Sequence, residues 1–83
     1  MTVPCYNTKM KKESNLHKLG RNIAIRRHEK GLSQDALALE AEIGERTVSR
    51  IESGETDPRF TTLQKIADTL DIELKVLMEF DKK

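Results

Sequence analysis

The sequence predicts an all-α fold, a compact bundle of four or five helices in one domain of 83 residues. Apolar residues recur at helical spacing in successive segments, most clearly at Leu63, Ile66, Ala67 and Leu70. Glycine, serine and proline separate these segments, as they do at the ends of helices. With 36% apolar residues, no Trp, one Tyr and two Phe, the chain can bury only a small core.

The first helix is expected to begin near Leu16, capped by Ser14 or Asn15, and to end at Gly31 in a glycine C-cap. Its inward stripe consists of Leu16, Leu19, Ile23 and Arg27. Gly20, inside this helix, either allows close packing against another helix or costs about 1 kcal/mol without compensation.

Two short amphipathic segments lie between Ser33 and Gly54. Ser33 is the expected N-cap of the second helix, and residues 45–53 form the third, which ends at Gly54. The inward residues are Leu37 and Ala38 in the second helix and Val48 and Ile51 in the third. Residues 42–44 leave room only for a turn. Two helices joined in this way form a helix-turn-helix motif, whose second helix can lie in the major groove of DNA.

The turn and one ion pair are expected to fix the angle of the third helix. Ile43 is apolar and should fill the angle between the two helices. Glu42 occupies a turn position where left-handed backbone is often needed, which costs a non-glycine residue about 1–2 kcal/mol. Glu52 borders the inner face of the third helix, and we expect it to pair with Arg27 of the first. The alternative is two solvated charges.

A loop containing Pro58 leads into the fourth helix, which Thr61 or Thr62 is expected to cap. Phe60 is one of only three aromatic residues and should anchor the core. The apolar residues of the fourth helix follow the i, i+3, i+4, i+7 pattern given above.

The C-terminal residues 72–80 alternate between apolar and polar side chains with one exception, Leu77, and this favours a β-strand. A single strand is not stable alone, so the strand implies pairing with the same strand of a second subunit. The rival is a fifth helix with Ile72, Leu74, Leu77 and Met78 inward. Both alternatives leave surface suited to a homodimer. The expected organisation is a flexible arm over residues 1–15, a helix-turn-helix domain over 16–71 and a dimerisation segment over 72–83.

The net charge of +1 conceals an asymmetry along the chain. Residues 1–30 hold eight Lys or Arg and two acids, whereas residues 31–83 hold seven and twelve. A basic face suits a nucleic acid, although two solvated surfaces of opposite sign would give the same count. The lysines of the arm could follow phosphates or be merely solvated.

Several classes of protein are not expected. The sequence contains no long apolar run, so we predict neither a membrane span nor a signal peptide, and a cytoplasmic location. Cys5 alone cannot form an internal disulfide or a zinc site. No nucleophile triad, phosphate-binding glycine loop or metal-spaced Cys/His set is present, so we expect neither an enzyme nor a cofactor.

The sequence resembles the lambda-repressor-like, XRE-type helix-turn-helix family over residues 16–79. The matching text is Leu19-Gly20, Ile23, Arg27, Gly31-Leu32-Ser33-Gln34, Leu37-Ala38, Thr47-Val48-Ser49-Arg50-Ile51-Glu52, Gly54, Pro58, Thr62-Leu63-Gln64-Lys65-Ile66-Ala67 and Leu70. The resemblance implies a compact bundle of four or five helices that binds DNA, usually as a dimer on a palindromic operator. Glu42 and Gly44 depart from the family, which commonly has Gly at the first position and Ser or Thr at the second.

The resemblance also implies the residues that contact DNA. Gln34 should hold a phosphate and brace the third helix, and Thr47 should lie near the sugar-phosphate wall. Ser53 and Arg59 are similar to positions that contact the backbone. The base edges should be contacted by Glu45, Arg46, Ser49 and Arg50. Their chemistry agrees, because Arg can bind guanine O6 and N7 with two hydrogen bonds and Glu can accept one from cytosine N4.

These observations predict a sequence-specific transcription regulator, a repressor that binds double-stranded DNA as a homodimer. Three alternatives use the same fold. The strand interpretation of the C-terminal segment is similar to HipB-type antitoxins, which would add a toxin partner. A restriction-modification controller is the second alternative. The third is a protein-interaction module that does not bind DNA, which the acidic half of the chain favours.

Overall fold

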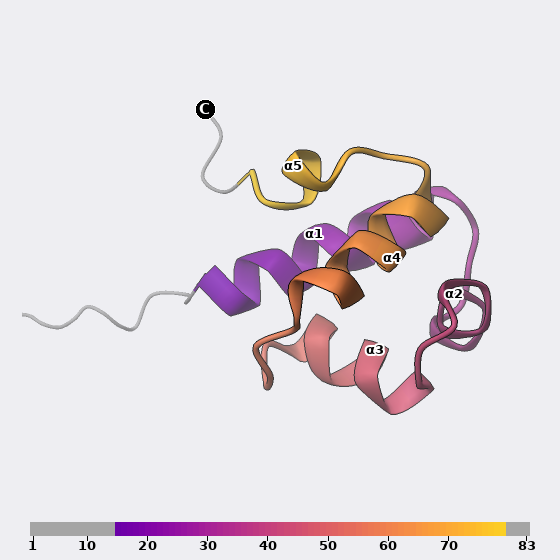
Figure 1. Cartoon of the computed structure of the whole chain (residues 1–83), viewed down its shortest axis with the longest axis horizontal. Helices are drawn as coiled ribbons and strands as arrows, with labels where there is room; N and C mark the ends of the chain where they lie inside the picture. The colour runs from indigo at the N-terminus through magenta and orange to yellow at the C-terminus, as the bar shows by residue number, and fades with distance from the viewer. Residues whose placement is uncertain (1–14, 80–83) are drawn as a thin grey trace, which may run out of the picture.

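The computed structural model describes residues 15–79, and they form five helices. These are α1 (Asn15–Glu29), α2 (Gln34–Ala41), α3 (Glu45–Ser53), α4 (Phe60–Leu70) and α5 (Leu74–Leu77). α1 and α4 cross the middle of the molecule, α3 lies on one side of them, α5 lies on the other, and α2 closes one end (Figure 1). The all-α prediction is confirmed, and none of the described helices is long and apolar enough to cross a membrane. The predicted arm and Cys5 lie outside the described residues, except that Asn15 is the first residue of α1.

The core forms where the predicted inward faces of all five helices meet. Its largest fully buried side chains are Ile23, Leu37, Val48, Ile51, Ile66 and Leu77. Leu32 and Ile43 pack against this cluster from the two short connections, so the predicted role of Ile43 is confirmed. Burial of these apolar surfaces is the main force that holds so short a chain together.

Close packing of α1 on α3 explains the glycine inside α1. A Cβ atom at Gly20 would lie 2.5 Å from the carbonyl oxygen of Ile51 and closer still to that of Glu52. Both atoms belong to the backbone of α3, which cannot rotate aside as a side chain can. The first alternative for Gly20, close helix packing, is therefore confirmed.

Short-range caps set the geometry of the helix-turn-helix motif. The Ser33 hydroxyl accepts a hydrogen bond from the Ala36 amide at 3.0 Å, as predicted for an N-cap. Glu42 adopts the left-handed conformation (φ 61°, ψ 44°), so the chain accepts the strain expected there. The Ile43 amide then donates to the Ala38 carbonyl at 3.0 Å. Gly44 is extended, so the turn uses Glu42 for its left-handed residue.

The start of α4 differs from the prediction. The helix begins at Phe60 with Arg59 as its N-cap residue, so neither Thr61 nor Thr62 caps it. Phe60 is 67% exposed, and its predicted place in the core is wrong. The reason is its position at the first residue of α4, because helical side chains lean toward the N-terminus and Phe60 has no preceding turn to cover. Leu63 is the first residue of α4 that the core buries.

The favoured C-terminal strand is also wrong, since residues 74–77 form α5. Leu77 of α5 is completely buried, and Leu74 of the same helix packs against the core together with Ile72 of the preceding connection. Its end is held by Asn22 of α1, whose side-chain amide donates to the carbonyl oxygens of Leu77 at 2.9 Å and Glu79 at 3.0 Å. These bonds satisfy backbone groups that a lone strand would leave unpaired.

Candidate nucleic-acid interface

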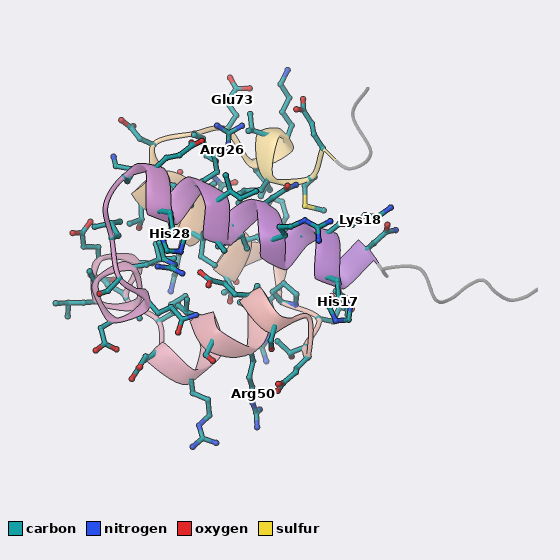
Figure 2. All side chains as sticks on the ribbon, turned by 180° about the vertical axis from the view of Figure 1, so that it is seen from behind. His17, Lys18, Arg26, His28, Arg50 and Glu73 are labelled. Carbon is teal, nitrogen blue, oxygen red and sulfur yellow. The ribbon has the colours of Figure 1, made fainter. Side chains whose placement is uncertain are left out.

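The outer face of α3 is a polar, mixed-charge surface on a helix whose inner face is fixed in the core. Val48 and Ile51 are buried, whereas other residues of this helix are exposed, among them Glu45, Arg46, Thr47, Ser49 and Arg50. Arg50 points away from the body of the molecule (Figure 2). This arrangement leaves a rigid helix with its polar face free to contact a ligand.

Five of the predicted DNA-binding residues lie together. Gln34 at the start of α2 lines a shallow hollow of about 470 Å³ with Glu45, Arg46, Ser49 and Arg50 of α3, and Glu55 lies at the same hollow. We call these five residues the α3 surface. It combines two guanidinium groups, one carboxyl group, one amide and one hydroxyl, which are the groups that bind base edges and phosphates.

The other three predicted residues are placed differently. Thr47 and Arg59 line a second hollow of about 340 Å³ together with Thr62 of α4. Arg59 thus brings a third exposed arginine to the C-terminal side of α3. The Ser53 hydroxyl donates to the Arg50 carbonyl oxygen within its own helix at 3.1 Å. A backbone contact by Ser53 stays a prediction.

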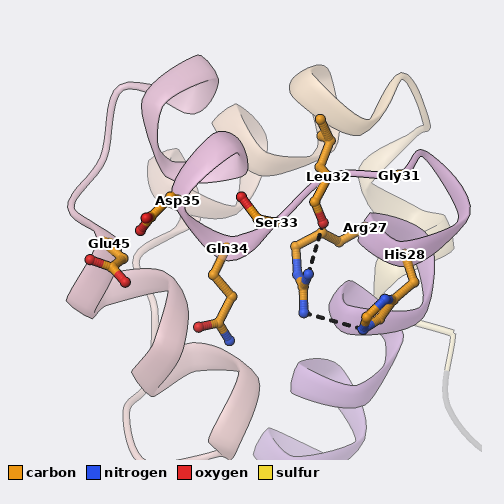
Figure 3. Close-up of a pocket in the computed structure, with 8 residues that line it drawn as sticks. All are labelled: Arg27, His28, Gly31, Leu32, Ser33, Gln34, Asp35 and Glu45. Carbon is orange, nitrogen blue, oxygen red and sulfur yellow. Dashed lines mark hydrogen bonds between the residues drawn. The ribbon is translucent and has the colours of Figure 1, made fainter.

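A buried ion pair between Arg27 of α1 and Glu52 of α3 holds α3 in place on the side opposite its exposed face. Arg27 Nε donates to Glu52 Oε2 at 2.7 Å, and a second guanidinium nitrogen donates to Glu52 Oε1 at 3.0 Å. A third bond runs from Arg27 to the Leu32 carbonyl oxygen at 2.8 Å (Figure 3). The predicted Arg27–Glu52 pair is confirmed, in the two-pronged geometry that best compensates lost hydration.

Gln34 connects this ion pair to the surface. Its side-chain amide donates to Glu52 Oε1 at 2.9 Å, which ties the start of α2 to the last turn of α3. The predicted bracing of α3 by Gln34 is therefore confirmed. Its contact with a phosphate stays a prediction.

Asp35 is a residue of this site that the sequence did not single out. Its carboxyl group lies beside that of Glu45, where the first turns of α2 and α3 meet (Figure 3). The side-chain hydrogen bond with Asp35, then the Asp35 charge, then partial loss of hydration raise the pKa of Glu45 above its ordinary value. The sequence does contain one indication of this contact, because both acids occupy the first turn of a helix and the two helices are joined by a tight turn.

Comparison with known proteins agrees with this geometry. The helix-turn-helix family model HTH_3 matches residues 23–77. A search of curated protein sequences finds no match. Among solved structures, the restriction-modification controller protein C.AhdI from Aeromonas hydrophila is similar with a TM-score of 0.76 and 32% identity, covering 78% of this chain and 98% of that one. The N-terminal DNA-binding domain of SinR from Bacillus subtilis is similar with a TM-score of 0.75 and 29% identity. That match covers 81% of this chain and 99% of the SinR domain.

The same fold also occurs within a longer regulator. The competence regulator ComR from Streptococcus vestibularis gives a TM-score of 0.76 and 31% identity, and the match covers 83% of this chain but 23% of that one. The family match covers more than half of the chain and includes the complete motif from α2 to α3. The chain therefore belongs to the HTH_3, XRE-type helix-turn-helix family of DNA-binding transcription regulators.

Proposed function

We propose that this protein is a sequence-specific repressor that binds a palindromic operator as a homodimer. The observation that carries the proposal is the α3 surface, because it places Arg46 and Arg50 on the exposed side of a helix whose inner side is locked in the core. Arginines on such a helix can bind guanine with two hydrogen bonds in the major groove. Repression follows where the operator overlaps a promoter.

Two exposed apolar residues, one in α1 and one at the C-cap of α5, support the homodimer. Ile25 is 46% exposed and Met78 is 43% exposed. Met78 directly follows Leu77, which Asn22 holds against α1, and Ile25 lies one helical turn after Asn22. Since α5 and α3 lie on opposite sides of α1 and α4, a second copy that packs on α5 leaves α3 exposed (Figure 1). The dimerisation segment of the proposal is thus α5, in place of the strand.

One observation favours a particular kind of regulator. The similarity to C.AhdI, a restriction-modification controller protein, extends over 98% of that chain. A gene for a DNA methylase beside the gene for this protein would support that role here. The antitoxin alternative depended on a C-terminal strand, and α5 occupies that segment.

Selection of bound sequences from random duplexes tests the proposed function. We expect enrichment of a palindrome whose half-site centres are about one helical turn, ~34 Å, apart. Affinity for the selected duplex should fall steeply between about 50 mM and 200 mM salt, because phosphate contacts release counterions. If no duplex is enriched and no binding depends on salt, the α3 surface would instead serve as a protein-binding module.

A further inference from the structure

The side chains that α3 contributes to the α3 surface form two rows along the helix. One row is Glu45 and Ser49, and the other is Arg46 and Arg50. Residues four positions apart lie one above the other on a helix, so each row runs along its axis. Both rows line the same hollow of about 470 Å³. The rows differ in their hydrogen bonding, because the first begins with a carboxylate, which only accepts, and the second consists of guanidinium groups, which only donate.

The guanidinium groups of the second row are available to a ligand. Within residues 15–79, no hydrogen bond or ion pair engages the side chain of Arg46 or Arg50. By contrast, the Arg27 guanidinium is engaged by Glu52 and by the Leu32 carbonyl oxygen. A guanidinium without such partners can donate two parallel hydrogen bonds, and guanine is the base that offers two acceptors, O6 and N7, in the major groove.

The start of α3 carries one residue of each kind. Glu45 and Arg46 are the first two residues of the helix, in the part of a recognition helix that contacts base edges. The N-cap residue before them is Gly44, so it places no side chain between the helix start and a groove. The Asp35 carboxyl group lies beside that of Glu45 and adds negative charge at this end of the first row (Figure 3).

A G·C base pair presents the matching pattern in the major groove. Its guanine carries two acceptors, and its cytosine carries one donor, the N4 amino group. Two neighbouring side chains of opposite hydrogen-bonding character can therefore contact both bases of one pair, with Arg46 donating to guanine and Glu45 accepting from cytosine. An A·T pair in the same orientation offers Arg46 one acceptor in place of two, and its thymine presents an acceptor to Glu45.

We propose that Glu45 and Arg46 together read one G·C base pair in each operator half-site, and that Glu45 adds specificity by excluding other pairs. The inference rests on the proposed function and names the base pair that this part of the α3 surface recognises. Guanine and thymine present acceptors in place of the cytosine amino group. The Glu45 carboxylate would then lose its water without gaining a donor, and an unpaired charged group is costly to bury.

Binding of the full chain to variants of the selected operator, each with one base pair replaced in both half-sites, tests this inference. The measurement is made at about pH 8 and constant salt, so that the carboxyl groups are ionised. Replacement of the shared G·C pair by A·T should lower the affinity of wild type roughly 5- to 150-fold per half-site. In Glu45→Gln and in Arg46→Ala the loss at that same pair should be much smaller, because glutamine can also donate to thymine and alanine makes no hydrogen bond. The losses at other positions should stay as in wild type.

The matched control is Glu55→Gln, because Glu55 lines the same hollow but follows α3 and lies outside both rows. It removes the same charge as Glu45→Gln, so it should raise the affinity for every duplex by a similar factor and leave the base preference unchanged. Relaxed preference at two different pairs, or at none, in variants that still bind would overturn this inference alone. The same relaxation in Glu55→Gln would do so too, since it would mark an effect of charge. Absence of salt-dependent binding by wild type to any duplex would overturn the proposed function, and this inference with it.

Discussion

Replacement of Glu52 by alanine is expected to lower the free energy of unfolding by about 3–5 kcal/mol. The substitution leaves the Arg27 guanidinium buried without its carboxylate and removes the acceptor of Gln34. An unpaired buried charge is far more costly than the pair was stabilising, and small domains have only about 5–15 kcal/mol in total. The midpoint and slope of urea unfolding, followed by helical circular dichroism, measure the loss.

Two further variants distinguish the effect of breaking the buried ion pair from the effect of removing any one charged side chain. Glu29→Ala removes an exposed partner, 3.4 Å from Arg26, and should change stability by no more than about 0.5 kcal/mol. The double replacement Arg27→Met with Glu52→Met removes both charges and should recover most of the stability lost in Glu52→Ala. If Glu52→Ala were as mild as Glu29→Ala, the ion pair would not hold α1 to α3 as the structure indicates.

Gly20→Ala is expected to destabilise the fold by about 1–3 kcal/mol. On helix propensity alone the change should stabilise α1 by about 1 kcal/mol, so the expected sign depends entirely on the contact with α3. The added methyl group would meet the carbonyl oxygens of Ile51 and Glu52, and the two helices must separate to accept it. Thermal or urea unfolding gives the sign directly.

Gly44→Ala is the matched control for that prediction. A Cβ atom there would lie 3.5 Å from the Thr47 hydroxyl, an ordinary contact, and the backbone is already extended. The cost should not exceed about 1 kcal/mol, the difference between glycine and alanine as N-cap residues. A Gly20→Ala protein at least as stable as wild type would mean that α1 and α3 do not approach as closely as described.

Much of the fold could be predicted because its signals are local. The spacing of Val48 and Ile51, the cap at Ser33 and the left-handed position of Glu42 depend on a few neighbouring residues. The C-terminal segment could not be assigned in this way, since its alternation also fits a strand. Asn22, which holds the end of α5, is 55 residues away from Leu77 in the chain. The burial of Phe60 was mispredicted for a similar reason, because the burial of a residue at the start of a helix depends on what the chain places beyond that helix end.

In the candidate site, too, some contacts could be predicted from the sequence and others could not. Arg27–Glu52 was predictable, because both residues border inward faces of helices that must touch. The contact between Asp35 and Glu45 was not, because these residues belong to different helices and neither lies on an apolar stripe. Which of the α3 surface residues touch bases depends on the docked DNA, and the resemblance to the family supplied that expectation.

Binding of Arg46→Ala to the selected operator and to random duplex, at one salt concentration, tests the central claim that α3 reads bases. Arg46 is exposed, so the fold should be retained. We predict a loss of about 1–3 kcal/mol per half-site on the operator, roughly 5- to 150-fold, and a much smaller loss on random duplex. Lys75→Ala on α5, which removes one charge on the opposite side of the molecule, should leave operator binding unchanged. Equal losses on operator and random duplex, or an equal effect of Lys75→Ala, would contradict the claim.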